Sequence, residues 1–433
     1  MTATSAADTA LRLWRPRVLD YLDDHTQQIV QHLSNLVKTP SISGSAEENG
    51  IQHQMAEQLS GLGLEVDHWP IPLADTLAAP DFPGVEVDRS EAWGVVGAAR
   101  GAGDGASLML NVHIDVVPAG NLDAWGPVSP FAGATDSNAV AGRGACDMKG
   151  GVIAAMWAVK ALTALRVPLR GDLILASVQG EEDGGLGTYA TLARGWRADA
   201  CVIPEPTSLD MVPANAGSLT FRLTINGRAA HASRRTTGTS AIEKFIPIFH
   251  ALRQLEARRN HTVDPLMTRW DVAYPIEIGQ VQAGDWSSSV PDLLTAQGRY
   301  GVALEETADH ARAQFTSAVH DACQSDPWLR DHPVDIHWWG GQFLPGRTDA
   351  DASILATLRQ AHSTVSPHPQ QTWGAPYGSD LRLMNGIGQV PTVHYGPGDA
   401  ALAHGPREMV PIDEVLTTAR TLALAAMIHC RIG

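Results

Sequence analysis

Residues 108–118 read LMLNVHIDVVP, an apolar run that ends in His113 and, one residue further, Asp115. Such a run predicts a buried strand, and residues two apart in a strand point to the same face. His113 and Asp115 should therefore emerge side by side at the strand's carboxyl end, where open α/β sheets bind their ligands. An imidazole that donates to a carboxylate through one ring nitrogen can bind a metal through the other. Taken alone, the pair is more often incidental than functional.

Strand-like and helix-like stretches alternate around this run. Residues 152–162 (VIAAMWAVKAL) predict a buried helix, 172–178 (DLILASV) a buried strand and 200–203 a short strand. Both strands are followed by polar residues. This alternation predicts an α/β fold, with a mostly parallel sheet flanked by helices. Helical spacing is also present over 13–37, 46–62 and 412–428.

The character of the sequence changes between residues 217 and 340. Alternating, half-exposed strands and helices over 240–258 and 305–323 follow one another in the order β-α-β-β-α-β. That order is typical of a ferredoxin-like α+β domain. We therefore expect a catalytic domain made of residues 1–216 and 341–433, interrupted by an inserted domain, 217–340.

Bulk properties exclude several classes of function. The 433 residues carry a net charge of −16, which leaves no basic excess for a nucleic-acid backbone. The four cysteines are far apart and form no CxxC pair, so neither a disulfide framework nor a thiolate zinc site is expected. Neither an apolar leader nor a run long enough to cross a membrane is present. We expect a cytoplasmic protein without a nucleic-acid or membrane partner.

Ionisable residues recur where the predicted strands end. Each has an ordinary explanation: Asp147 could cap a helix, Glu181 and Glu182 could form a solvated turn, and His404 could be a surface histidine. The carboxyl ends of parallel strands meet at one edge, however, and this many carboxylates can gather there only if cations neutralise them. The full set is His113, Asp115, Asp147, Glu181, Glu182, Glu205 and His404.

This combination of imidazoles and carboxylates suits zinc, cobalt or manganese. A carboxylate that bridges two pairs, each of one His and one Glu, holds two metal ions about 3.5–4 Å apart, an arrangement used for hydrolysis. A Glu left over can then take a proton from the water between the metals. The residues alone therefore favour a di-metal hydrolase.

Seven motifs extend this interpretation along nearly the whole chain. The sequence resembles the di-zinc metallopeptidase family that includes acetylornithine deacetylase, succinyl-diaminopimelate desuccinylase, aminoacylase and the glutamate carboxypeptidases. The matching motifs occur in the family's order. They are HIDVVP (113–118), GRGACDMKGG (142–151), QGEEDGG (179–185), PEPT (204–207), NGRAAHAS (226–233), YGSD (377–380) and GPGDAALAH (396–404).

The resemblance implies a role for each residue of the set. One metal ion would be held by His113 and Glu205, and the other by Glu182 and His404. Asp147 would bridge them, and the peptide bond after it would be cis. The two remaining roles fall to Asp115, which would orient His113, and to Glu181, the general base. The cofactor would be two divalent ions, Zn²⁺ by default, with Co²⁺ or Mn²⁺ as alternatives.

The substrate-binding residues are less sharply indicated. The inserted domain matches the family's lid and dimerisation domain, and His231 in its HAS motif matches a histidine that stabilises the oxyanion. Arg299 could clamp a substrate carboxylate bidentately, although an ordinary surface arginine explains it as well. Walls of the pocket would come from Ser379, Asp380, Gly396 and Gly398.

Glu205 bears on the choice of substrate, because deacylase and carboxypeptidase relatives carry Glu there, whereas aminopeptidase and dipeptidase relatives tend to carry Asp. The resemblance thus implies a homodimeric deacylase of N-acyl amino acids, in which Glu181 activates a metal-bridging water. A metallo-carboxypeptidase or dipeptidase acting on peptides is the alternative. A non-catalytic, metal-dependent binding protein is the rival from another class.

Overall fold

The structure is a computed structural model that describes residues 6–433. The first five residues, part of the stretch in which no leader was expected, lie outside the described residues. The chain divides into two compact units, which we call the larger and the smaller unit. The larger unit comprises Met1–Pro213, Arg347–Trp373 and Asp380–Gly433, and the smaller comprises Ala214–Gly346 and Gly374–Ser379.

A nine-stranded sheet runs through the larger unit, in the order β1-β2-β6-β3-β7-β17-β8-β15, with β16 paired to β8. The four central strands β6, β3, β7 and β17 are parallel to one another, and β1, β2 and β8 pair antiparallel. The strands are β1 (Glu65–Pro70), β2 (Trp93–Ala99), β3 (Leu108–His113), β6 (Leu173–Val178), β7 (Ala200–Ile203), β8 (Met211–Asn215), β15 (Gly346–Arg347), β16 (Thr372–Ala375) and β17 (Thr392–His394).

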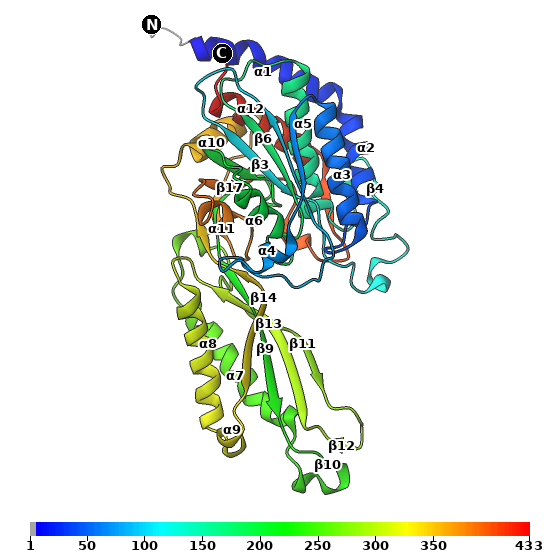
Figure 1. Ribbon diagram of the computed structural model, residues 1–433, viewed down its shortest axis with the longest axis vertical. Coiled ribbons are helices and arrows are strands. Elements are labelled where there is room, and N and C mark those ends of the chain that lie inside the picture. The colour runs from blue at the N-terminus through cyan, green and yellow to red at the C-terminus, as the bar shows by residue number, and fades with distance from the viewer. Residues whose placement is uncertain (1–5) are drawn as a thin grey trace. The chain divides into compact units, whose positions relative to one another are not determined.

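Helices flank this sheet (Figure 1) and bury its central strands completely. Strands covered on both faces read as continuous apolar runs, which is why LMLNVH and LILASV signalled them. Helix α5 is apolar on all sides and packs against α12. The helices are α1 (Ala6–Asp24), α2 (Thr26–Val37), α3 (Ala46–Gly61), α4 (Leu73–Leu77), α5 (Gly150–Ala164), α6 (Leu186–Ala193), α10 (Ser353–Val365), α11 (Leu381–Asn385) and α12 (Ile412–His429).

The single helix predicted over residues 13–37 is two helices in the structure. The spacing over 13–37 indicated a single helix, but α1 ends at Asp24 and α2 begins at Thr26, because His25 leaves helical geometry with φ −104° and ψ 11°. The apolar spacing continues through the break, so it could not reveal it. The predicted α/β class with a mostly parallel sheet is confirmed.

The smaller unit contains a four-stranded antiparallel sheet in the order β11-β13-β9-β14. Alternate residues of β9, such as Leu219, Phe221 and Leu223, face helices α7 and α8 in one apolar core. The chain order is β9-α7-β11-β13-α8-β14, the predicted β-α-β-β-α-β succession. These elements are β9 (Gly217–Asn226), α7 (Ala241–Arg259), β11 (Ile276–Ala283), β13 (Leu293–Val302), α8 (Ala308–Gln324), α9 (Pro327–Asp331) and β14 (Asp335–Phe343), with the short β10 (Ala230–His231) and β12 (Ser289–Val290).

The chain passes from the larger unit to the smaller between residues 213 and 214, and returns between residues 346 and 347. The predicted domain boundaries are 216/217 and 340/341. The short segment Gly374–Ser379 also belongs to the smaller unit. That residues 1–216 and 341–433 form a catalytic domain and 217–340 a lid and dimerisation domain stays a prediction.

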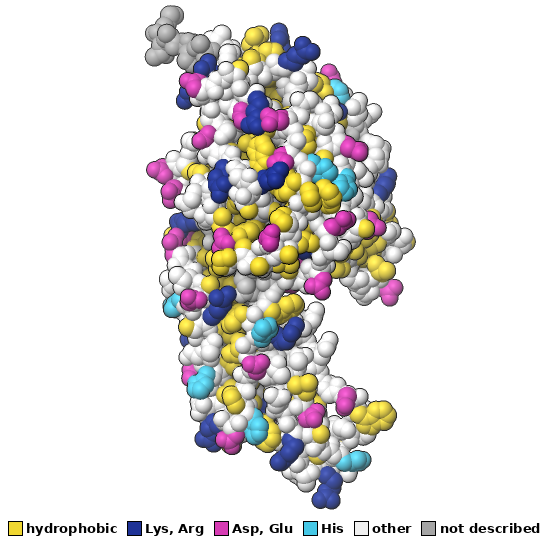
Figure 2. Space-filling view, in the orientation of Figure 1, with side chains coloured by type: hydrophobic (Ala, Val, Ile, Leu, Met, Phe, Trp, Pro, Cys, Tyr) yellow, Lys and Arg dark blue, Asp and Glu magenta, His cyan; other side chains and the backbone are white. Residues whose placement is uncertain are grey.

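The surface and the cysteines can be compared with the bulk properties. Lys and Arg side chains are interspersed with Asp and Glu over the face drawn in Figure 2. All four cysteines are buried and unpaired. Among residues 6–433, no helix combines the length and the apolar character needed to cross a membrane.

Candidate metal centre

The five predicted metal ligands come from five different segments of the larger unit. His113 is the last residue of β3, Glu182 lies in the loop after β6, and Glu205 follows β7. Because β6, β3 and β7 are parallel neighbours, their carboxyl ends lie at one edge of the sheet. Asp147 comes from the turn Ala145–Lys149 before α5, and His404 from the loop before β18 (Met409–Pro411).

The side chains form two pairs joined by one carboxylate. His113 Nε2 lies 3.7 Å from Glu205 Oε1, and His404 Nε2 lies 3.1 Å from Glu182 Oε2. Between them, Asp147 places Oδ1 3.2 Å from the first imidazole and Oδ2 3.5 Å from the second. Each oxygen of Asp147 therefore faces one His–Glu pair, which is what a bridging ligand requires.

The charges at this site favour cations. Burial alone would lower the pKa of His113, but Glu205 and Asp147 raise it well above its usual value. Glu182 is the main cause that raises the pKa of His404, to about 11. The carboxylates beside each imidazole therefore favour positive charge at this site, which divalent ions can supply. Ligand atoms of His113, Asp147 and Glu182 lie within 4.8 Å of one another, so this group fits a metal site.

The tautomer of His113 supports the same conclusion. Its Nδ1 lies 3.0 Å from the backbone carbonyl of Asp115, to which it can donate, and this leaves Nε2 available as a metal ligand. The Asp115 carboxylate, which was predicted to orient His113, is farther from this nitrogen than the carbonyl is, because its Oδ1 lies 3.7 Å from Nδ1. That carboxylate instead accepts the backbone N–H groups of Glu181 and Glu182, both at 3.2 Å. Asp115 therefore ties β3 to the loop that carries two other site residues.

Glu181 lies beside the pairs without joining either of them. Its side chain is buried, and burial followed by the charge of Asp380 raises its pKa well above the ordinary value. A buried carboxyl group beside the two pairs is a candidate for proton transfer at this site. The peptide bond between Asp147 and Met148 is cis, which confirms the cis bond that the family resemblance implied after Asp147.

The four residues predicted to shape the walls of the pocket are buried or closely packed. Ser379 and Asp380 are buried, and Asp380 accepts a hydrogen bond of 2.5 Å from Thr188. A Cβ at Gly396 would lie 2.5 Å from the carbonyl oxygen of Glu205 and one at Gly398 2.7 Å from Cys146. The two glycines therefore allow close packing against the segments that carry metal ligands.

Two predicted residues belong to the smaller unit. His231 is exposed, and its Nδ1 lies 2.8 Å from the Ser233 hydroxyl. Arg299 lies on β13 with its guanidinium 5.5 Å from the centre of the Phe343 ring.

Sequence reasoning missed two buried ion pairs near the site. Arg89 binds Asp183 through both of its terminal nitrogens, at 2.8 and 2.9 Å, and Glu48 accepts the N–H of Gly180 at 2.9 Å. These contacts hold the loop on which Glu181 lies. The other pair joins Arg143 to Glu408. Both Arg143 and Asp183 lie inside quoted motifs, but their partners carry no local signal.

Comparison with known proteins agrees with the geometry. A model of the peptidase family M20/M25/M40 matches residues 109–428. The chain belongs to this family. As an M20-family member it is a hydrolase of amide bonds, and the predicted family resemblance is confirmed.

Individual relatives share little sequence identity with this chain, but the similarity extends over nearly its whole length. A curated N-formyl-4-amino-5-aminomethyl-2-methylpyrimidine deformylase from Halalkalibacterium halodurans is 26% identical over 94% of this chain and 95% of its own length. Human carnosine dipeptidase 1 has a similar fold, with a TM-score of 0.74 and 15% identity, over 96% of this chain and 99% of that one. A dinuclear metal-binding M20 peptidase from Bacillus subtilis aligns with a TM-score of 0.59 and 15% identity, over 93% of this chain and 99% of that one.

Proposed function

We propose that the protein is a di-metal deacylase that cleaves the amide bond of N-acyl amino acids. The observation that carries the proposal is the position of Asp147, whose two oxygens face two separate His–Glu pairs at 3.2 and 3.5 Å. One ion would be held by His113 and Glu205 and the other by Glu182 and His404. The B. subtilis peptidase described as dinuclear shares this fold.

The chain's own residues divide the remaining work. Two divalent ions, Zn²⁺ by default and Co²⁺ or Mn²⁺ as alternatives, would supply Lewis-acid polarisation of the amide carbonyl and acidify the attacking water. Glu181 would take the proton from that water and pass it to the departing nitrogen. In the smaller unit, His231 would stabilise the oxyanion and Arg299 would bind the substrate carboxylate.

Two considerations bear on the choice between acyl removal and peptide cleavage. Glu at position 205 resembles the deacylase and carboxypeptidase branch of the family, which favours a deacylase over a dipeptidase. The curated relative from H. halodurans is named for removing a formyl group from an amine. A dipeptidase or carboxypeptidase is the second candidate, favoured by fold neighbours such as human carnosine dipeptidase 1.

A substrate panel with metal depletion tests the proposal. The full-length protein is treated with chelator, reloaded with Zn²⁺, Co²⁺ or Mn²⁺, and assayed on N-formyl, N-acetyl, N-succinyl and N-aromatic-acyl amino acids, an N-formyl aminomethylpyrimidine, and dipeptides. We expect activity to vanish with chelator and return with about two metal ions per chain. Preferential hydrolysis of dipeptides would replace the deacylase with the second candidate. Stoichiometric metal binding without hydrolysis of any compound would favour the binding protein.

We also propose that the protein is a homodimer that associates through the smaller unit. Ile242, Ile246 and Phe249 lie four and three residues apart on α7 and are all exposed. Helix α7 packs beside β11, which pairs with β13 alone and is an edge strand of its sheet. An exposed apolar stripe beside an unpaired strand edge is typical of an association surface. A second copy of this chain would cover both features.

The four buried, unpaired cysteines are consistent with a reducing compartment, and we propose a cytoplasmic location. Fractionation of the source cells with an antibody to the protein tests this location.

A further inference from the structure

A buried ion pair lies behind the metal centre in the larger unit. Arg143 Nη1 donates to Glu408 Oε2, and both side chains are almost completely buried. Arg143 follows β5 (Ala139–Ala141), and Glu408 precedes β18, which pairs antiparallel with β5. The pair joins residues 265 positions apart in the sequence. Burying two charges is costly, and this pair makes further hydrogen bonds that hold neighbouring segments in place.

Glu408 holds the backbone from which the bridging carboxylate projects. Its Oε1 accepts the N–H of Asp147 and the N–H of Cys146, both at 3.3 Å. Its own backbone carbonyl accepts the N–H of Gly142 at 3.0 Å. The side chain of Glu408 thus helps to fix the turn that carries Asp147.

Arg143 holds the segment that carries His404. Its Nη2 donates to the backbone carbonyl of His404 at 3.1 Å and to that of Pro118 at 3.4 Å. His404 has a positive φ of 61°, which is unfavourable for a residue other than glycine, and its side chain is 54% exposed. Since this residue lies outside the strands and its side chain is largely exposed, the bond from Arg143 to its carbonyl is a direct restraint on its backbone.

We propose that Arg143 and Glu408 are positioning residues that set the approach of His404 to Asp147, and thereby the affinity of the metal ion on that side. The proposal rests on the di-metal function proposed above. His113 needs no such support, since it ends a buried strand and is oriented by the carbonyl of Asp115. The two metal positions therefore differ in how they are built, one on the sheet and one on loops clamped by this ion pair.

Metal titration of the full-length protein tests the proposal. Zn²⁺ is titrated calorimetrically into chelator-treated wild-type protein and Arg143→Met, and Co²⁺ is titrated in parallel while the visible absorption of each bound ion is followed. We expect two binding steps in the wild type. In Arg143→Met the weaker step should lose about 10- to 100-fold in affinity, as is typical when a residue that supports a ligand is removed, while the tighter step stays unchanged.

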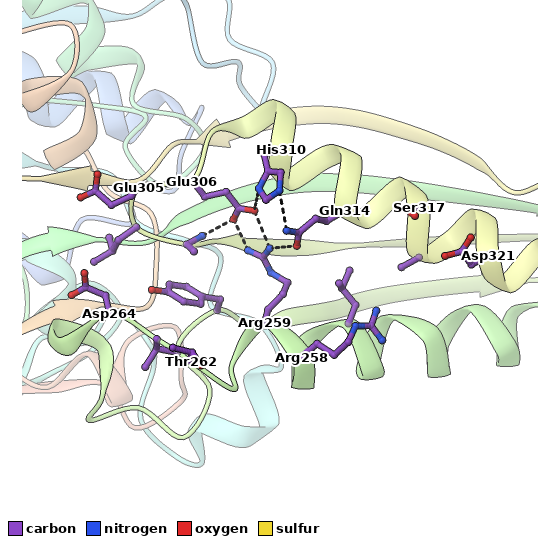
Figure 3. A pocket seen from close by; sticks show the side chains of 16 residues that line it. Arg258, Arg259, Thr262, Asp264, Glu305, Glu306, His310, Gln314, Ser317 and Asp321 are labelled. Atoms are coloured by element: carbon purple, nitrogen blue, oxygen red, sulfur yellow. Dashed lines mark hydrogen bonds and ion pairs between the residues drawn. The ribbon is translucent and has the colours of Figure 1, made fainter.

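A second buried ion pair supplies the control for lost stability. In the smaller unit, Arg259 donates to Glu306 at 3.0 and 2.6 Å and to Gln314 at 2.7 Å (Figure 3). The side chains of Arg259 and Glu306 are 6% and 7% exposed, similar to those of Arg143 and Glu408. Arg259→Met should lower the melting temperature as Arg143→Met does, but leave both metal affinities unchanged.

Further variants separate the outcomes. If Arg143→Met does not fold, Arg143→Lys replaces it in the test. Lysine keeps the positive charge but lacks the guanidinium group that reaches both Glu408 and the His404 carbonyl, so this variant should also weaken the weaker metal-binding step. In a His404→Ala background, Arg143→Met should cause little further loss. Unchanged affinities, equal weakening of both steps, or additive effects with His404→Ala would each overturn the proposal. A wild type that binds fewer than two ions would instead overturn the di-metal function.

Discussion

Glu181 and Glu182 are adjacent and chemically identical, yet the fold gives them different environments. Glu182 reaches His404 at 3.1 Å, whereas Glu181 is buried beside the His–Glu pairs without joining either, and its pKa is raised by burial and by Asp380. Both backbone N–H groups are held by Asp115. The difference between the proposed metal ligand and the proposed base therefore comes from the direction in which each side chain leaves one fixed loop.

Substitutions of this pair should separate catalysis from metal binding. Glu181→Gln removes the proton acceptor and should lower kcat by about 10²- to 10⁴-fold, with metal content unchanged. Glu182→Gln removes a charged ligand and should lower the metal content itself. Steady-state kinetics together with metal analysis of the purified variants provides the readout. Full activity in Glu181→Gln would show that another residue is the base.

His394 should make stability depend on pH. It is completely buried on β17, and burial lowers its pKa to about 3. The unfolded chain binds this proton below about pH 6.5, so the stabilisation is complete above that pH and is lost as the pH falls towards 3. Between pH 7.5 and 5, metal-free wild type should lose about 2 kcal/mol more of its unfolding free energy than His394→Asn does. Urea denaturation at both pH values measures this difference, and parallel losses would contradict it.

The seven ionisable positions could be predicted because each directly follows a recognisable strand or lies in a distinctive loop. Glu408 and Arg89 could not. Their role depends on partners such as Arg143 and Asp183, 265 and 94 residues away in sequence, and on packing that places two charges together out of water. Local patterns carry no information about such partners.

At the scale of elements, the loop after β17 is held against the loop after β7. Gly396 passes so close that a Cβ would lie 2.3 Å from the carbonyl oxygen of Pro204 and 2.5 Å from that of Glu205. Any side chain there must displace the segment that carries a predicted metal ligand.

Gly396→Ala should therefore cost about 1–3 kcal/mol of stability and weaken metal binding. Gly61→Ala is the matched control, since it lies at the end of α3 and, apart from its chain neighbours and the backbone of its own helix, no described heavy atom lies within 4 Å of the added carbon. Thermal unfolding and Zn²⁺ titration of both variants test the expectation. Equal behaviour of the two variants would show that the loop adapts without cost.

The central elements were predictable, and the peripheral ones less so. Apolar runs identified β3, β6 and β7, because strands buried on both faces need no alternation. The outer strands β8 and β15 were not anticipated. The first reads MVPAN with an internal proline, and the second has two residues, so neither has the length or composition that marks a strand.

At the scale of the whole molecule, the apolar stripe on α7 predicts the state of association. Ile246 is 50% exposed at its centre. Ile246→Glu would place a charge where the proposed dimer buries apolar surface, and should convert dimers to monomers in sedimentation velocity. Leu77→Glu alters a 46% exposed residue of the larger unit and should leave the dimer intact. A monomeric wild type, or a dimeric Ile246→Glu variant, would contradict the proposed interface.

The larger unit is assembled from chain segments on both sides of the smaller one, and this has a consequence for synthesis. Four of the five predicted metal ligands are translated by residue 205, but His404 follows about 200 residues later. At about 5–20 residues per second, the ribosome needs roughly 10–40 s to cover that distance. During this interval the nascent chain exposes a cluster of carboxylates with one imidazole, and Arg143 has no Glu408 to pair with. Loading of the proposed two-metal centre would therefore be a late event, which follows translation of the entire inserted unit.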